Sequence, residues 1–405
     1  MKSQMYIEAI SKQEYESKTR LVASLKIDGV EKECWFDYPS EYSRYVCDER
    51  IDAFAIALIP LAMRKGLDIK SSIPISEKLS YQLRNYYIPI LSKYQKTFKK
   101  IKLLCPCSSA NYNMKGAVGT GVSCGNDSFY SILKHIDINE KDFQLTHLVT
   151  MNVGSFGYQG GEFSYYWFQK EVKKAKMVSS ELNLPLIEIN SNLMEIYQEN
   201  HSFSGTFRMA GAILGIQKLF SKYYISAGVD IKKFDITSEV NDDYDMFNLL
   251  VASNESTTFY STGLEATRFE RTKYITRYTV TYDKLTVCMC GNENCGKCAK
   301  CMQMLGALYV LNQLSNYKKS FDVDKFEKHK IMNLAKLRYY GLWYKTHFYK
   351  EIYSVFKQEQ PFTYWLCTVI AITIIYPTEM IKKFVKKILP ENVIKKLKKI
   401  IKKDD

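Results

Sequence analysis

The chain has 405 residues, of which 46% are hydrophobic and 25% are charged, a composition typical of a globular protein with two or three domains. Its net charge of +14 is concentrated at the C-terminus, because residues 378–405 contain ten lysines and only four acidic residues. The rest of the chain is mildly basic, which argues against nucleic acid as a partner, whereas a basic tail suits an anionic membrane surface.

Residues 1–100 predict a small α+β domain. The runs 21–27 and 30–36 alternate between apolar and polar residues and flank Asp28-Gly29, which predicts a hairpin because both turn residues must accept a positive φ. Helices are expected over 51–65, which ends before a glycine, and over 76–93.

Residues 101–315 predict an α/β domain, because strand-like and helix-like segments alternate along them. The strands are expected at 117–122, 145–152, 184–189 and 223–228, each followed or preceded by a helical pattern. This order predicts a parallel, Rossmann-like sheet with right-handed crossovers. Ligands of such sheets bind beyond the carboxyl ends of the strands.

The hexapeptide Ser123-Cys124-Gly125-Asn126-Asp127-Ser128 lies where the first of these strands turns into a helix. The first amides of a helix have no internal partner and attract a phosphate. Gly125 lets the backbone approach the anion closely, and Ser123 and Ser128 add hydroxyl donors. We expect Asp127 to act through Mg²⁺ or by ordering the loop amides. An ordinary capped junction between a strand and a helix is the alternative.

The hexapeptide resembles the Ser-Gly-Gly-x-Asp-Ser motif of the PP-loop ATP pyrophosphatase superfamily, an adenine nucleotide alpha hydrolase-like group of HUP-type fold. The match keeps Ser123, Gly125, Asp127 and Ser128 and departs at Cys124, where the family has its first glycine. The resemblance covers about residues 100–310 and implies that ATP is the substrate. It also implies that Asp127 and Ser128 are catalytic and that all four matching residues bind the nucleotide.

A basic run follows the Ser261-Thr262-Gly263 turn and contains Arg268, Arg271 and Lys273. We expect these three side chains, with Arg268 as the nucleotide-binding residue, to help to neutralise the triphosphate or the leaving pyrophosphate. A solvated basic face is the alternative.

Five of the eleven cysteines fall between Cys288 and Cys301, which is typical of a metal site and not of a disulfide framework. Cys288, Cys295, Cys298 and Cys301 have the spacing C-x6-C-x2-C-x2-C, which suits a tetrahedral Zn²⁺ ion. Cys290 could replace Cys288, and a redox dithiol or separately buried cysteines are the alternatives. The arrangement resembles the structural zinc site that follows the PP-loop domain of 7-cyano-7-deazaguanine synthase.

These features together predict an adenylating enzyme. A carboxylate or amide oxygen of a small-molecule substrate would attack the α-phosphorus of ATP, pyrophosphate would leave with Mg²⁺, and ammonia or another nucleophile would displace AMP. The chain organisation suggests surface-polysaccharide or modified-metabolite biosynthesis. The alternatives are a sulfur-transferring enzyme with a reactive Cys124, Cys105 or Cys107, and a non-catalytic, zinc-stabilised nucleotide-binding protein.

A helical segment is expected over 316–360, followed by a tail over 361–405. Phe362–Tyr376 is uncharged and apolar but, at about 15 residues, shorter than the ~20 that span a bilayer. Met380–Lys403 then alternates apolar residues with paired lysines and is broken by Pro390. Since the N-terminus has no signal-peptide core, we expect a cytoplasmic protein held peripherally on the inner face of the cell membrane. A buried core helix and a partner-binding helix are the alternatives.

Overall fold

The computed structural model describes residues 4–388 except 158, 289, 292 and 344–346. The chain forms two compact units, Met1–Thr286 and Val287–Asp405. The boundaries expected at residues 100, 315 and 360 do not divide the structure in this way. The cysteine cluster therefore belongs with the C-terminal helices, and the N-terminal segment belongs with the α/β domain.

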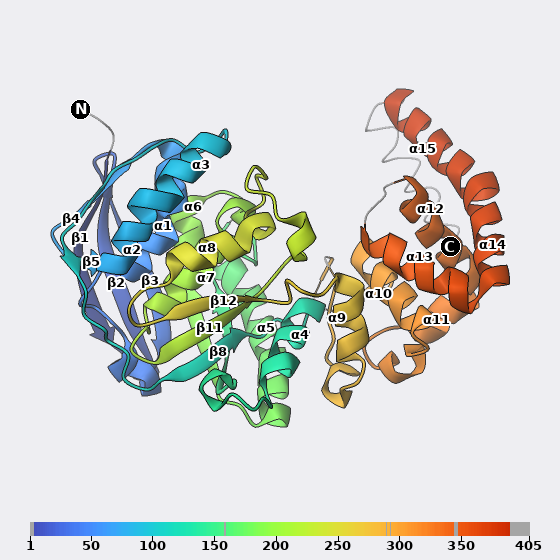
Figure 1. Ribbon diagram of the computed structural model, residues 1–405, viewed down its shortest axis with the longest axis horizontal. Helices are drawn as coiled ribbons and strands as arrows, with labels where there is room; N and C mark the ends of the chain where they lie inside the picture. Colours follow the sequence, from blue (N-terminus) through green and yellow to red (C-terminus); the bar gives the residue numbers. More distant parts are fainter. Residues whose placement is uncertain (1–3, 158, 289, 292, 344–346, 389–405) are drawn as a thin grey trace. The chain divides into compact units, whose positions relative to one another are not determined.

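Unit 1 is built on a ten-stranded sheet with the strand order β12-β11-β8-β9-β10-β3-β2-β1-β4-β6 (Figure 1). The five strands from β12 to β10 are parallel, and their order reverses at β8, which lies between β9 and β11. This confirms a Rossmann-like α/β arrangement with a topological switch point at β8. The bounds are β8 Ala117–Gly121, β9 His147–Asn152, β10 Leu186–Ser191, β11 Phe220–Ser226 and β12 Thr258–Thr262.

The N-terminal strands extend the same sheet. The predicted hairpin is confirmed, because Asp28 and Gly29 join β2 to β3 with φ of 50° and 85°. β3 pairs antiparallel with β10 through Asn190 and Asp37, so no domain boundary falls near residue 100. The sequence analysis missed β1. The bounds are β1 Gln4–Glu14, β2 Lys18–Ile27, β3 Val30–Pro39, β4 Asp68–Ser71 and β6 Leu103–Leu104, and a separate pair is β5 Ile75–Ser76 with β7 Cys107–Ser108.

Helices cover both faces of the sheet. Right-handed crossovers place α4 and α5 on one face, and α7 and α8 on the other, where α7 also packs against α1. The predicted helix 76–93 is continuous, with a π turn at Leu83–Tyr87 between α2 and α3. The bounds are α1 Asp52–Lys65, α2 Glu77–Gln82, α3 Ile88–Tyr94, α4 Asn126–His135, α5 Gly161–Leu182, α6 Leu193–Tyr197, α7 Gly205–Leu214, α8 Asp245–Ala252 and α9 Arg268–Ile275.

A buried polar network at the amino ends of the parallel strands joins distant parts of unit 1. The Arg50 guanidinium lies 3.1 Å from the Asp52 carboxylate and 3.2 Å from that of Glu255. It also donates to Gln217 Oε1 at 2.7 Å. Since Gln217 precedes β11 and Glu255 precedes β12, this network fastens the N-terminal segment to the parallel sheet.

Unit 2 is helical in its described residues. Its elements are α10 Ala299–Val310, α11 Val323–Lys328, α12 Lys330–Trp343, α13 His347–Glu359, α14 Pro361–Ile370, a π turn at Ala371–Ile375 and α15 Tyr376–Ile388. Lys284–Val287, where the two units meet in the sequence, form no strand.

The apolar run Phe362–Tyr376 was expected to be too short to span a bilayer, but the helix that contains it continues from α14 into α15. Pro361–Phe384 is a helix of 24 residues, and it is the one helix in the described ranges that is long and apolar enough to cross a membrane. Only 17% of its most apolar stretch is buried, which counts against a core helix. Residues 389–403, with the break expected at Pro390, lie outside the described residues.

Gly211 sets the distance between α1 and α7. A Cβ at Gly211 would lie 2.6 Å from the Ala53 carbonyl oxygen and 2.7 Å from the Ala57 Cβ. Only a glycine therefore allows these two helices to approach so closely.

We predict that Gly211→Ala lowers the free energy of unfolding of the protein by about 1–3 kcal/mol, since overpacking a core forces backbone shifts. Gly205→Ala in the same helix is the matched control, because a Cβ there would meet no atom closer than 3.6 Å. Thermal and urea unfolding measure both variants. An equal effect of the two substitutions would contradict this account of the α1–α7 contact.

Candidate functional site

The Ser123–Ser128 loop lies at the carboxyl edge of the parallel sheet. It connects β8 to α4, and β8 is the strand at which the strand order reverses. Ligands of doubly wound sheets commonly bind beyond the carboxyl ends of the strands at such a switch point. The sequence analysis placed this loop correctly between a strand and a helix.

The N-terminus of α4 offers an anion-binding cradle. Gly125 is its N-cap residue and supplies no side-chain cap. The backbone N–H groups of Asn126, Asp127 and Ser128 have no acceptor in the part of the chain that the structure describes. These amides and the helix dipole together favour a phosphate-like anion at this position.

Cys124 occupies a backbone conformation that suits glycine. Its φ is +53°, within the left-handed region that side chains disfavour. Its side chain is fully buried, and its carbonyl oxygen accepts a hydrogen bond of 2.8 Å from the Thr286 N–H. Burial and the nearby Glu171 carboxylate raise the pKa of the Cys124 thiol to about 12. The thiol is therefore protonated and inert at neutral pH.

The Ser128 hydroxyl braces the loop. Its Oγ accepts a hydrogen bond of 3.1 Å from the Ser123 N–H and donates one of 2.9 Å to the Gly121 carbonyl oxygen. The Ser123 side chain is exposed and remains free to contact a ligand. In this structure Ser128 thus fixes the shape of the loop, and its expected role as a phosphate donor stays a prediction.

Asp127 is held by two guanidinium groups. Its Oδ1 lies 2.8 Å from Arg271 Nη1 and its Oδ2 lies 3.2 Å from Arg268 Nη2. The carboxylate therefore orders the loop by ion pairing, which is one of the two roles expected for it. The other role, through Mg²⁺, stays a prediction.

Arg268 and Arg271 both lie on α9 but differ in burial. The Arg271 side chain is 1% exposed, and its remaining N–H groups donate to carbonyl oxygens of Ala227, Val229, Gly263 and Ala266. The Arg268 side chain is 38% exposed and donates otherwise only to the Gly228 carbonyl oxygen at 3.2 Å. Arg271 is thus a structural cation, and Arg268 is the one available to a ligand.

The sequence pattern placed Arg271 in a basic run expected to neutralise phosphate and did not predict its ion pair with Asp127. The sequence does contain a pattern that predicts a helix here, because Thr267-x-x-Glu270 is a capping box and starts a helix at Arg268. A helix there puts Arg268 and Arg271 three residues apart on one face.

A cavity lies at the same edge of the sheet, beside the ends of β9 and β10. It has a volume of about 610 Å³, and its walls include Arg20, Trp35, Asp37, Asn152 and Asn190. Arg20 binds Asp37 through contacts of 2.5 and 2.8 Å, and its guanidinium carbon lies 3.8 Å from the centre of the Trp35 ring. The volume and the mixed polar and aromatic lining suit a small organic ligand.

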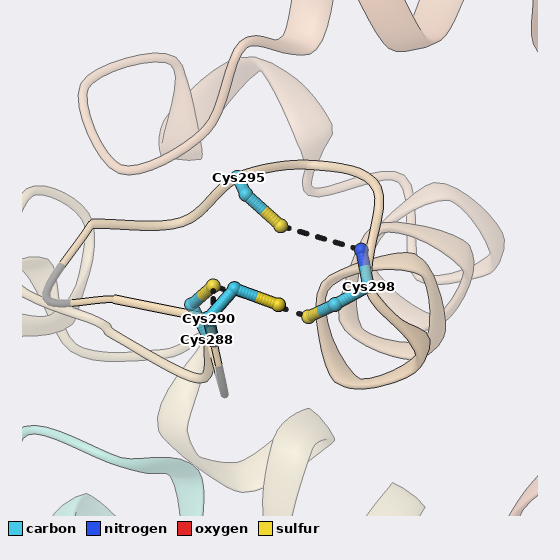
Figure 2. A group of neighbouring side chains, drawn as sticks. All are labelled: Cys288, Cys290, Cys295 and Cys298. Carbon is cyan, nitrogen blue, oxygen red and sulfur yellow. Dashed lines mark hydrogen bonds between the residues drawn. The ribbon is translucent and has the colours of Figure 1, made fainter. Parts of the chain in front are cut away.

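In unit 2, four cysteine thiols converge. The sulfur atoms of Cys288, Cys290, Cys295 and Cys298 all lie within 4.8 Å of one another (Figure 2). The distance between Cys288 Sγ and Cys298 Sγ is 3.9 Å, close to the ~3.8 Å edge of a tetrahedron with Zn–S bonds of about 2.3 Å. The donor set therefore fits a metal ion such as zinc.

Backbone amides prepare this cluster for a metal. The N–H groups of Lys297 and Cys298 point at Cys295 Sγ and lower the pKa of Cys295 to about 6. A thiolate is the form that binds a metal. These bonds arise from the turn at Gly296, whose φ is +65°.

The four converging thiols differ at one position from the ligand set expected from the spacing. Cys290 belongs to the group of four and Cys301 does not. Cys301 lies inside α10 with a fully buried side chain, and its Sγ contacts Asn294 Oδ1 at 3.9 Å. Cys288, Cys295 and Cys298 stay as expected. The helix that begins at Ala299 turns Cys301 inward, which spacing alone does not reveal.

We predict that Cys124→Gly leaves the free energy of unfolding within about 1 kcal/mol of the native protein, because relief of the positive φ offsets the lost burial. Cys124→Val should lower it by about 2 kcal/mol or more, since a β-branched residue disfavours this conformation. Cys124→Ala isolates the contribution of the thiol. A valine variant as stable as the glycine variant in urea unfolding would refute the strain.

We predict that the purified protein contains one zinc ion per chain, measured by elemental analysis. Cys290→Ser should lose the metal and destabilise unit 2, because structural zinc contributes strongly to folding. Cys301→Ser should keep the metal. If Cys290→Ser retains zinc and Cys301→Ser loses it, the fourth ligand is Cys301, as the spacing predicts, and not Cys290.

Comparison of the chain with protein-family models, with curated proteins and with solved structures found no match.

Proposed function

We propose that unit 1 binds ATP at the Ser123–Ser128 loop and transfers its AMP group to a small-molecule acceptor with release of pyrophosphate. An acceptor oxygen forms a bond to the α-phosphorus, and the bond from that phosphorus to the bridging oxygen of pyrophosphate breaks. Ammonia or another nucleophile then displaces AMP from the activated carbon. Mg²⁺ would neutralise charge on the leaving group.

The observation that carries this proposal is the set of three unpartnered amides at the start of α4, beside the exposed Arg268 guanidinium. Amides fixed in place before the reaction stabilise developing negative charge without a reorganisation cost. Arg268 can exchange its contact with Asp127 for a phosphate oxygen, because both are anionic and its side chain is solvent-accessible. The resemblance of the hexapeptide to the PP-loop motif supports the same assignment.

Asp127 and Arg271 act as positioning residues in this proposal. Asp127 lies in the first turn of α4 and Arg271 lies on α9, so their ion pair holds the loop against the strand ends after β11 and β12. Arg271 also keeps the Asp127 carboxylate from facing the phosphates as an uncompensated charge.

The acceptor would bind in the cavity lined by Arg20, Trp35 and Asp37. β8 and β10 are separated by one strand, which corresponds to about 10 Å at the usual strand spacing. A molecule in this cavity can therefore extend toward a nucleotide at the loop. In this proposal the N-terminal hairpin belongs to the catalytic unit, because β2 and β3 supply Arg20, Trp35 and Asp37 to the cavity.

The sulfur-transfer alternative receives less support. Burial raises the pKa of Cys105 to about 11, and Cys124 is protonated at neutral pH for the same reason. Neither thiol is the thiolate that such chemistry requires. Cys107 is exposed and is the remaining candidate of the three.

We predict that the protein converts ATP to AMP and pyrophosphate in the presence of Mg²⁺ and an acceptor, measured by ³¹P NMR or a pyrophosphate assay. Asp127→Asn and Ser128→Ala should lower turnover about 10²–10³-fold, because both distort the amide cradle. Arg268→Gln should raise the KM for ATP about tenfold or more and leave the melting temperature unchanged.

Arg277→Gln is the matched control, since Arg277 is exposed, lies just beyond α9 and has no contact with the loop. Products of ADP and phosphate would overturn the cleavage at the α-phosphorus. ATP binding without turnover under a broad set of acceptors, including with Cys124→Gly, would favour the non-catalytic alternative.

A further inference from the structure

Unit 2 contains a cavity that the proposed ATP chemistry does not use. Its volume is about 600 Å³, and α10, α11, α12 and α15 contribute to its walls. Leu305, Phe326, Leu337 and Ile375 form part of an apolar lining. The size suits a small ligand or the head of a larger one.

Lysines from separate segments converge on this cavity. Lys297 comes from the cysteine loop, Lys325 from α11 and Lys336 from α12. None of their ammonium groups has a carboxylate within ion-pair distance among the residues that the structure describes. The fourth, Lys382, pairs with Glu379 at 2.7 Å. These three lysines are exposed, and the lysines of the cavity outnumber its acidic lining residues, Asp322 and Glu379. This excess of positive charge favours an anionic ligand, and ammonium groups suit phosphate.

The wall formed by α15 has two contrasting sides. Glu379 and Lys382, one turn apart, face the cavity. On the opposite side Ile381, Phe384 and Ile388 are 63%, 65% and 60% exposed. Large apolar side chains rarely remain so exposed in a row on a helix in water. An amphipathic helix of this kind lies in the interface of a bilayer with its apolar side among the acyl chains.

We propose that the cavity of unit 2 binds the phosphate head group of an anionic membrane lipid while the apolar side of α15 rests in the membrane interface. With α15 in that position, the cavity lies at the depth of the head groups or just above them. Lys297, Lys325 and Lys336 then face the phosphate, and the apolar lining covers the carbon atoms next to it. The cavity thus adds a specific lipid contact to general attraction of basic residues to the surface.

The test uses the full-length protein and vesicles of phosphatidylcholine with or without phosphatidylglycerol, with binding measured by flotation. Lys325→Gln/Lys336→Gln should weaken binding to phosphatidylglycerol vesicles about tenfold or more. This is the loss of binding expected when two lysines are removed from an anionic membrane surface. The matched control is Lys350→Gln/Lys357→Gln, which removes the same charge from exposed positions on α13 outside the cavity. The control variant should bind nearly as the native protein does.

Equal losses in the two double variants would overturn the cavity site and leave only diffuse electrostatic attraction. Phe384→Asp should abolish flotation, and its failure to do so would overturn the interfacial position of α15. Glycerol 3-phosphate and inorganic phosphate serve as soluble probes. Binding of either as tight as that of the vesicles would show that the ligand is a free phosphate compound and would refute a membrane lipid.

Pyrophosphate release by unit 1 is measured in the same preparations without vesicles. The lysine substitutions should leave it unchanged, because these residues lie outside the loop and its cavity. Failure of the lipid proposal is therefore distinguishable from failure of the proposed ATP chemistry.

Discussion

The arrangement of the loops at the carboxyl edge of the sheet depends on the contacts of the buried Arg271 guanidinium. It binds the Asp127 carboxylate and carbonyl oxygens of Ala227 and Gly263, and so joins the segments that follow β8, β11 and β12. A buried cation needs such complete pairing, because removal from water is costly. The loop geometry, the free amides of α4 and the availability of Arg268 all follow from this arrangement.

The polar groups at the two ends of the parallel sheet differ in how completely they are paired. At the amino ends the Arg50 network fastens the N-terminal segment to the sheet, and its partners are buried or half-buried. Most of its polar atoms are paired, and Arg50 Nε is the exception among the described residues. At the carboxyl ends the amides of Asn126–Ser128 have no acceptor among the residues that the structure describes, and a cavity of about 610 Å³ adjoins β10. Paired polar groups stabilise the fold. The unpaired amides are able to accept an anion, and the cavity further along the same edge of the sheet has room for a small ligand.

The cysteine site of unit 2 depends on local backbone geometry more than on packing. The turn at Gly296 directs two amides at Cys295 Sγ, and the thiols of Cys288 and Cys298 meet at 3.9 Å. A metal held there would tie the start of α10 to the preceding loop. Lys297 projects from that same loop into the lysine-lined cavity, so a metal would also steady one wall of the proposed lipid site.

The sequence by itself determined the features that depend on neighbouring residues: the Asp28-Gly29 turn, the helix end at Gly66, the loop between β8 and α4, and three of the four clustered cysteines. Backbone sterics and hydrophobic periodicity act over a few residues, so a single sequence reveals them. Only the tertiary structure decided that the N-terminal hairpin extends the parallel sheet, that Arg271 binds Asp127 across 144 positions of sequence, and that Cys290 replaces Cys301 in the cluster. These outcomes depend on which distant surfaces pack together and on which way a helix turns a side chain, and neither is encoded in spacing along the chain.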